Sequence, residues 1–170
     1  MGIRAERVAM LVAVVALLVG GFLVASVKWN EYSCERRIER DRATVRTDRG
    51  PIRAELAPLG AVVGVHWVLD PDRQCGLLPV PGTDRDSQAG VVRIEPARAA
   101  DLVARYTGWE AADTFDAIPI LGRYLPRGGT WRHAGELDAA FAGAHPGESA
   151  RYVVDVASGT VLFSSYADHF

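Results

Sequence analysis

The chain is poor in several residue types, and each shortage limits what the protein can be. Its 170 residues include two cysteines, one lysine and one asparagine, and the formal net charge is −2. Two cysteines are too few for a disulfide-rich mini-protein, and they lack the spacing of a structural zinc site. The small negative charge argues against nucleic acid as a partner. With 49% hydrophobic residues, however, the chain is too apolar to be disordered.

Motifs of known chemistry are also missing. There is no His-Glu-x-x-His zinc motif, no Gly-x-Ser-x-Gly nucleophile elbow, and no phosphate loop or dinucleotide fingerprint. Three acidic pairs lack the alternating oxygens and closing glutamate of a calcium loop, and we interpret them as turn and cap residues: Asp70/Asp72, Asp84/Asp86 and Asp113/Asp116. The sequence therefore assigns no catalytic residue, no metal ligand and no cofactor.

The strongest positive feature is an uncharged run of twenty residues, Val8–Val27. As an α-helix this run would be about 30 Å long, which matches the thickness of a bilayer core. Lys28, Trp29 and Tyr32 follow it, and these residue types are typical of the headgroup region. The run therefore predicts a transmembrane helix over residues 8–27, with the lipid bilayer as its partner.

Two other interpretations of this run remain open. A cleaved signal peptide has an apolar stretch of about 7–15 residues and a small-residue cleavage site, for which Val24-Ala25-Ser26 could serve. A buried core helix is the second, but such helices rarely contain twenty consecutive uncharged residues. The length of the run favours an uncleaved anchor over both alternatives.

The sequence features that predict the orientation of the chain in the membrane disagree with one another. Basic residues are more numerous after the run than before it, which by the positive-inside rule favours a cytoplasmic C-terminal part. The short N-terminal tail, the signal-anchor arrangement and the position of both cysteines after the run favour the opposite. We expect residues 1–7 to form a cytoplasmic tail, and the C-terminal domain of this single-pass membrane protein to be extracytoplasmic.

Beyond the run, the chain divides into a connector and one domain. Residues 28–53 carry charges of both signs with an excess of arginine, and Gly50-Pro51 interrupts this stretch. We interpret residues 28–53 as a charged, solvated stalk. Residues 54–170 are long enough to form one soluble domain with its own core.

Within this domain, strand and helix patterns alternate. Strands are indicated by β-branched stretches between turns, and helices by apolar stripes with proline or glycine at their ends. The pattern predicts strands over Ala61–Leu69, Gly90–Ile94, Tyr152–Val156 and Thr160–Phe163, helices over Ile52–Leu56, from Pro96 to a Gly108 cap, and over Glu136–Ala142, and irregular segments over 70–90 and 110–132. We expect an α+β fold, in which a small antiparallel sheet of about four strands carries two helices on one face.

The last two predicted strands form the clearest hairpin. Between them, Gly159 can adopt the positive φ that the turn requires, and Asp155 can accept hydrogen bonds from the turn backbone.

Cys34 and Cys75 are the only cysteines, and they lie 41 residues apart. Outside the cell membrane they would form a disulfide that stabilises the fold by roughly 4 kcal/mol through chain entropy. In the cytoplasm they would be free thiols. The predicted disulfide between Cys34 and Cys75 therefore depends on the predicted orientation.

Two histidines are the candidates for chemistry. His66 lies in the middle of a predicted strand, where a hydrogen-bonded structural role is the expectation. His133 and Glu136 flank a loop-to-helix junction, and a carboxylate in the first turn of a helix explains Glu136. At the chain end, Ser164 and Ser165 precede Asp168 and His169, but adjacent strand residues point to opposite faces.

Six aromatic residues could either line a ligand groove or fill the core: Trp67, Tyr106, Trp109, Tyr124, Trp131 and Tyr152. In a domain of this size, aromatic side chains more often serve the core.

Several of these motifs together resemble uncharacterised single-span membrane proteins of high-GC Gram-positive bacteria. The motifs are His66-Trp67 in a strand, Cys75 in a proline-rich loop, the Val-x-Ile-x-Pro junction at residues 92–96 and the Asp-x-x-Ser-Gly hairpin. They cover about half of the chain and are weakly specific. The resemblance implies a bacterial membrane protein and no particular activity.

These observations predict a membrane-anchored module of the cell envelope that binds a ligand or a membrane or envelope protein and is not an enzyme. One alternative is an envelope hydrolase that uses His66 or His133 with a carboxylate. Another is an accessory subunit that faces the cytoplasm. A pocket in which a histidine meets a carboxylate would favour the hydrolase.

Overall fold

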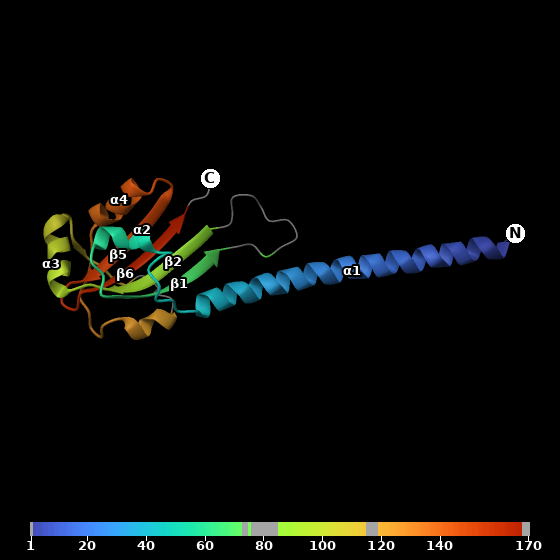
Figure 1. Cartoon of the computed structure of the whole chain (residues 1–170), viewed down its shortest axis with the longest axis horizontal. Coiled ribbons are helices and arrows are strands. Elements are labelled where there is room, and N and C mark those ends of the chain that lie inside the picture. Colours follow the sequence, from blue (N-terminus) through green and yellow to red (C-terminus); the bar gives the residue numbers. More distant parts are fainter. Residues whose placement is uncertain (1, 73–74, 76–84, 115–118, 168–170) are drawn as a thin grey trace.

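The computed structural model describes residues 2–72, 75, 85–114 and 119–167 (Figure 1). Its described strands form one antiparallel sheet in the order β1-β2-β6-β5-β4-β3. The strands are β1 (Gly64–Asp72), β2 (Arg85–Arg93), β3 (Glu110–Ala111), β4 (Trp131–His133), β5 (Glu148–Asp155) and β6 (Thr160–Ala167). The predicted α+β class is correct, but the sheet has six strands rather than about four.

The two strands that the sequence missed are very short. β3 and β4 contain two and three residues, so neither is long enough to display the alternation of polar and apolar residues that marks a strand. β3 lies within the segment 110–132, which was predicted to be irregular, and β4 ends one residue beyond it. Their pairing with each other and with β5 extends the sheet on the side opposite β1.

Helical segments cover both faces of this sheet, and one long helix extends away from it. The helical segments are α1 (Gly2–Ala43), α2 (Arg53–Leu56), the 3-10 turn η1 (Ala57–Leu59), α3 (Pro96–Arg105), the 3-10 segment η2 (Pro119–Tyr124) and α4 (Gly135–Ala144). Figure 1 shows α1 projecting away from the sheet, with the N-terminus far from the rest of the chain.

Helix α1 crosses the border that the sequence placed between a transmembrane helix and a stalk. It continues to Ala43, so residues 28–43 of the predicted connector are helical. Many side chains of the predicted 8–27 segment, including those of residues 11–14, lie outside the described part of the chain. Among the residues that the structure does describe, no helix offers a stretch long and apolar enough to span a membrane.

The first hairpin is longer than the sequence predicted. β1 continues to Asp72 and β2 begins at Arg85, so both ends of the predicted loop over 70–90 are paired strand. Of the stretch 73–84 between them, only residue 75 is described. The polar residues at the start of β2 have no apolar pattern that would indicate a strand. They pair with β1 because apolar residues farther along, such as Val65 opposite Val92, fix the register of the two strands. The backbone hydrogen bonds between the strands then continue to the polar end.

Both faces of the sheet are covered. One core contains the apolar residues of α2, η1, α3 and α4 together with inward-facing residues of β1, β2, β5 and β6. On the other face Val68, Val91 and Leu162 pack against Leu121 of η2. The predicted α3 and α4 lie on one face, but α2 lies on that face as well. The second layer was not predicted, because η2 lies in a segment with no helical periodicity.

Packing at the centre of the first core depends on a glycine. Gly90 on β2 lies opposite Trp67 on β1 and opposite Phe163 on β6. A Cβ atom at Gly90 would lie 2.4 Å from Phe163 Cε1 and 2.8 Å from Trp67 Cβ. Both aromatic side chains are buried, and the Trp67 indole N–H donates to the Asp48 carbonyl at 2.8 Å. The absence of a side chain at Gly90 is therefore what allows the two rings to pack over β2.

Substituting Gly90→Ala is expected to destabilise the protein by about 1–3 kcal/mol, because the added methyl group must displace a buried ring. The free energy of unfolding is measured by urea titration of the full chain in non-ionic detergent, with tryptophan fluorescence as the signal. Gly64→Ala is the control, since Gly64 is also a strand glycine but a Cβ there meets nothing within 4 Å. Equal losses in the two variants would contradict this account of Gly90.

Candidate functional site

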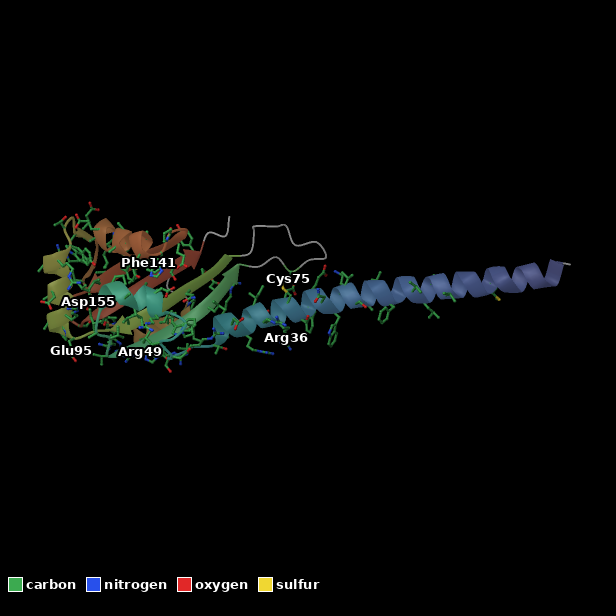
Figure 2. All side chains as sticks on the ribbon, turned by 45° about the horizontal axis from the view of Figure 1, so that its top comes forward. Arg36, Arg49, Cys75, Glu95, Phe141 and Asp155 are labelled. Atoms are coloured by element: carbon green, nitrogen blue, oxygen red, sulfur yellow. A yellow bond between two sulfur atoms is a disulfide. The ribbon has the colours of Figure 1, made fainter. Side chains whose placement is uncertain are left out.

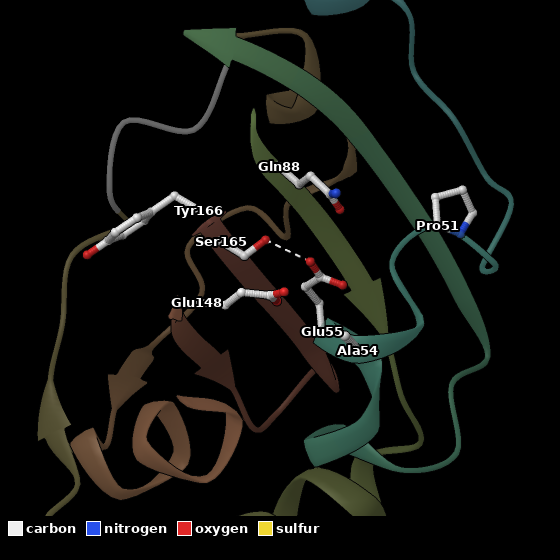
Figure 3. A pocket seen from close by; sticks show the side chains of 7 residues that line it. All are labelled: Pro51, Ala54, Glu55, Gln88, Glu148, Ser165 and Tyr166. Carbon is white, nitrogen blue, oxygen red and sulfur yellow. Dashed lines mark hydrogen bonds between the residues drawn. The ribbon is translucent and has the colours of Figure 1, made fainter. Parts of the chain in front are cut away.

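A cavity of about 200 Å³ lies between α2 and the sheet, at the end of the sheet where β6 finishes (Figure 3). It is open to solvent on one side. The described residues that line it come from α2 and the turn before it, from β2, and from the paired strands β5 and β6: Pro51, Ala54, Glu55, Gln88, Glu148, Ser165 and Tyr166. We refer to it as the Glu55 cavity.

Glu55 reaches this position because of the helical repeat in its segment. Ile52, Leu56 and Leu59 are buried in the first core, and their spacing defines one face of a helical turn. Glu55 follows Ile52 by three residues, so it shares this inward face, and its exposed fraction is only 5%. A carboxylate is therefore held on the buried side of α2, between apolar neighbours.

Two hydrogen bonds fix Glu55 in place. Its backbone carbonyl accepts a hydrogen bond from the Tyr152 hydroxyl at 2.9 Å. Its Oε1 atom accepts a hydrogen bond from the Ser165 hydroxyl, also at 2.9 Å. Burial, reinforced by the negative charge of Glu55, raises the pKa of Tyr152 well above its ordinary value, so this hydroxyl stays protonated and remains a donor.

Two other oxygens in the cavity have no partner. Glu55 Oε2 and Gln88 Oε1 are both buried and neither accepts a hydrogen bond within the described chain. Leaving a buried acceptor unpaired costs roughly 1–3 kcal/mol, and more when the group is charged. Figure 3 shows Gln88 and Glu148 reaching toward Glu55, whereas the Tyr166 ring points away from it. The cavity is thus a buried site with unused acceptors.

The charge of the cavity has one sign. Glu55 and Glu148 are carboxylates, and none of the described lining residues is basic. Neither carboxylate belongs to an ion pair among the described side chains. Such a set of oxygens can bind hydrogen-bond donors or a cation, whereas an anion would be repelled.

Of the polar lining residues, only Ser165 was named from the sequence, and there it was grouped with Asp168 and His169 rather than with Glu55. A local signal for Glu55 existed, because it occupies one position of the otherwise apolar stripe formed by Ile52, Leu56 and Leu59. No local signal existed for Gln88 or Ser165. They meet because β2 pairs with β6 in a register that places Gln88 opposite Ser165.

His66 lies on the other face of the sheet from the Glu55 cavity. Its ring stacks on Tyr124 of η2 with centroids 3.8 Å apart and an interplanar angle of 9°. Its Nδ1 atom is buried without a partner. The hydrogen-bonded role expected for His66 is therefore not seen at Nδ1, and the ring is held by stacking on Tyr124. No carboxylate accompanies the ring among the interactions of the described residues.

His133 does meet a carboxylate, but not that of Glu136. Its Nε2 atom lies 2.8 Å from Asp138 Oδ2. Asp138 also accepts a hydrogen bond from the Tyr152 backbone N–H at 2.9 Å, which ties α4 to β5. No hydroxyl or thiol joins the His133–Asp138 pair among the described interactions. The pair therefore holds α4 against β4.

Glu136 lies in the first turn of α4 as predicted, but its carboxylate bonds to the end of α3 rather than to its own helix. It accepts hydrogen bonds from the backbone N–H and the hydroxyl of Thr107, both at 2.6 Å. These bonds favour the charged form and lower the pKa of the Glu136 carboxyl below its ordinary value. Thr107 follows α3, so this contact links the ends of α3 and α4.

The other sequence candidates are dispersed. Asp70 pairs with Arg42, and Asp113 is exposed. Ser165 is buried on the cavity side, whereas Ser164 pairs with Ala89 of the opposite face, as strand alternation requires. Asp84, Asp116, Asp168 and His169 lie outside the described residues, as do the side chains of Asp72 and Asp86. Within the described residues, no cluster of three or more histidine, cysteine, aspartate or glutamate side chains could hold a metal ion.

The six aromatic residues serve the two cores. Trp67 and Tyr152 are fully buried in the first core, and Tyr106 and Trp109 pack at its edge. Trp131 and Tyr124 belong to the second core. None of the six is among the described residues that line the Glu55 cavity.

Cys34 and Cys75 lie within disulfide distance, as the sequence led us to expect. Their Cα atoms are 5.6 Å apart, and the pair forms a disulfide that joins α1 to the segment after β1 (Figure 2). Two further contacts fasten the end of α1 to the sheet. Arg42 pairs with Asp70 of β1, and the Arg46 and Trp67 backbones exchange hydrogen bonds of 2.7 and 2.9 Å. The helix is thus attached to one edge of the domain.

Comparisons with known proteins add no further constraint on this site. No protein-family model matches the chain, and no curated protein or solved structure is significantly similar to it.

Glu55→Gln is expected to stabilise the ligand-free protein by about 1 kcal/mol. The amide oxygen can keep the hydrogen bond from Ser165, and the amide nitrogen replaces an unpaired buried oxygen with a donor near Gln88. Urea unfolding of the full chain in non-ionic detergent measures the difference. Glu110→Gln serves as the control, because Glu110 is exposed on β3 and its replacement should change stability by less than about 0.5 kcal/mol. A loss of stability in Glu55→Gln alone would contradict the unpaired state of the carboxylate.

Proposed function

We propose that the protein is a membrane-anchored module of the cell envelope that binds a small ligand in the Glu55 cavity without transforming it. The observation that carries the binding function is the pair of buried oxygens, Glu55 Oε2 and Gln88 Oε1, that face an open cavity without partners. Folding alone gains nothing from leaving them unpaired. A ligand that donates hydrogen bonds to both would recover the cost.

Anchoring is supported by the amino-acid sequence and by the surface of α1. The twenty residues from Val8 to Val27 carry no charge. Several of the described side chains in this stretch are large, apolar and between 64% and 76% exposed: Met10, Leu17, Leu18, Phe22 and Val24. Exposing so much apolar surface to water is unfavourable, by about 25 cal/mol for each Å². A lipid bilayer would remove this cost along the length of the helix.

The side of the membrane is argued from the cysteines. A disulfide persists in oxidising compartments and is rare in the bacterial cytoplasm. The geometry of Cys34 and Cys75 suits a disulfide, which supports an extracytoplasmic location for the domain. We therefore propose a cytoplasmic tail over residues 1–7, a membrane-spanning segment over 8–27, a helical stalk from residue 28 onward, and a domain outside the membrane.

Binding rather than catalysis is favoured by the chemistry of the cavity. Apart from Ser165, its polar lining consists of two carboxylates, an amide and a phenol, and no histidine is among the described lining residues. Ser165 donates its hydroxyl hydrogen to Glu55 and has no imidazole base among its described partners. The two histidines that could have served a hydrolase lie elsewhere, in the contacts of His66 with Tyr124 and of His133 with Asp138.

We expect the full chain to remain in the membrane pellet after washing with high salt and with alkaline carbonate. A peripheral protein held by charges would be released, whereas a helix with twenty uncharged residues in lipid would not. Immunoblotting of pellet and supernatant measures the distribution. The matched control replaces Leu17 and Leu18 by arginine, which should release the protein because each arginine costs about 2.5–3.5 kcal/mol at the bilayer centre. A released wild-type chain, or a shorter form beginning near Val27, would contradict the anchor.

Thiol labelling of intact cells tests the location of the domain. With a membrane-impermeant maleimide, we expect no labelling before reduction and labelling of both Cys34 and Cys75 after reduction with an impermeant phosphine. Cys34→Ser should leave Cys75 reactive without reduction, which controls for reagent access. No labelling under any of these conditions, together with labelling in lysed cells, would favour the alternative of an accessory subunit that faces the cytoplasm.

A further inference from the structure

We propose that the ligand of the Glu55 cavity is an organic ammonium ion, with its charged nitrogen held by Glu55 Oε2 and Gln88 Oε1. This inference rests on the proposed binding function and specifies its chemistry. The two oxygens are unpartnered and buried, and Glu55 as a whole is 95% buried, since its exposed fraction is 5%. They belong to side chains from α2 and β2, which approach the cavity from different sides (Figure 3).

The hydrogen-bonding capacity of the site selects the nitrogen. An ammonium group carries three donors and no acceptor, so it complements the two unpartnered acceptors of the cavity, Glu55 Oε2 and Gln88 Oε1. Hydrogen bonds between a charged donor and a carboxylate are roughly twice as strong as neutral ones. A hydroxyl group has a single hydrogen to donate and could satisfy only one of the two oxygens. An ammonium ion could satisfy both and still donate toward the Glu148 carboxylate.

The charge of the Glu55 cavity also favours a positively charged ligand. Glu55 and Glu148 place two negative charges around one small volume, and the described lining residues contain no cation to offset them. Their mutual repulsion is relieved when a positive ligand enters between them. Ordered water could donate to the unpaired oxygens, but it would leave this repulsion in place. A positively charged ligand is therefore favoured over water or a neutral molecule.

Size and wall chemistry favour an organic cation over a metal ion. The cavity of about 200 Å³ has the volume of six or so water molecules at about 30 Å³ each, which is far more than one ion fills. Calcium needs six to eight oxygen ligands, and no group of three acidic or histidine side chains is gathered within the described residues. Pro51 and Ala54 add an apolar wall that suits the alkyl part of an amine.

The test measures the melting temperature of the full chain in non-ionic detergent, followed by tryptophan fluorescence. Four probes of similar size or charge are compared at constant ionic strength: n-propylammonium, 1-propanol, propionate and Ca²⁺. A ligand that binds only the folded state raises the melting temperature with its concentration. We expect n-propylammonium to give a saturable rise, and the other three probes to give none.

Three variants link the effect to the cavity. Glu55→Gln removes the charge while keeping the shape, and should weaken propylammonium binding at least tenfold. Because this variant is expected to be no less stable than the wild type, lost binding would not reflect unfolding. Gln88→Glu adds a second carboxylate to the same pair of oxygens and should strengthen binding. Glu110→Gln, which removes an exposed carboxylate on β3, should leave binding unchanged.

The possible outcomes separate this inference from the proposed function. A rise with propylammonium that Glu55→Gln abolishes and Glu110→Gln retains supports both. A rise with 1-propanol or Ca²⁺ that depends on Glu55, without one for propylammonium, overturns the ammonium ligand but leaves a binding function in place. A propylammonium effect that persists in Glu55→Gln overturns the assignment to this cavity. No effect of any probe on the wild-type protein overturns both the ligand and the binding function.

Discussion

The pairing of β2 with β6 at the centre of the sheet places Gly90 beside Phe163, and two residues earlier it places Gln88 beside Ser165. The first pair lets the aromatic rings of the main core pack over β2. The second pair builds one wall of the Glu55 cavity. A slip of one residue in this register would turn both pairs to the opposite face. The stability of the core and the integrity of the cavity therefore depend on the same alignment, and the close packing at Gly90 keeps that alignment in place.

A second buried carboxylate makes the state of Glu55 easier to interpret. Asp155 is buried to nearly the same extent as Glu55. Its Oδ1 atom accepts a hydrogen bond from the Thr130 backbone N–H, and its Oδ2 atom accepts one from the Ser158 hydroxyl. Asp155 thus uses both oxygens to hold the hairpin turn and the start of β4. Glu55 uses one oxygen and presents the other to a cavity, which is the difference between a structural carboxylate and one available to a ligand.

The attachment of α1 gives the cavity a defined position along the chain. The disulfide between Cys34 and Cys75, the ion pair of Arg42 with Asp70 and the backbone bridge of Arg46 with Trp67 all hold the end of α1 at the β1 edge. Trp67 also packs against Gly90, so the same residue contributes to the attachment and to the core. If the segment over residues 8–27 lies in the bilayer as proposed, Cys34 is about 10 Å beyond its end along the helix. Helix α1 continues to Ala43, so the sheet that its end contacts would begin roughly 24 Å from the membrane edge.

The features that depend on neighbouring residues could be predicted from the amino-acid sequence. Local patterns predicted the hairpin turn, where Gly159 has a φ of +63°, and the start of α3 at Pro96. They also predicted the α+β class and the alternation that places Val65 and Trp67 on one face of β1 and Val68 on the other. The remaining features depend on contacts between segments that are distant in the sequence. β3 and β4 are too short to carry a pattern, and the polar start of β2 is a strand because of its partners. The apolar stripe around Glu55 indicated that its side chain could be buried. Whether its carboxylate finds a partner depends on Gln88 and Ser165, which lie 33 and 110 positions farther along the chain. Register and burial are properties of the assembled sheet, so a site built from them cannot be derived from neighbouring residues alone.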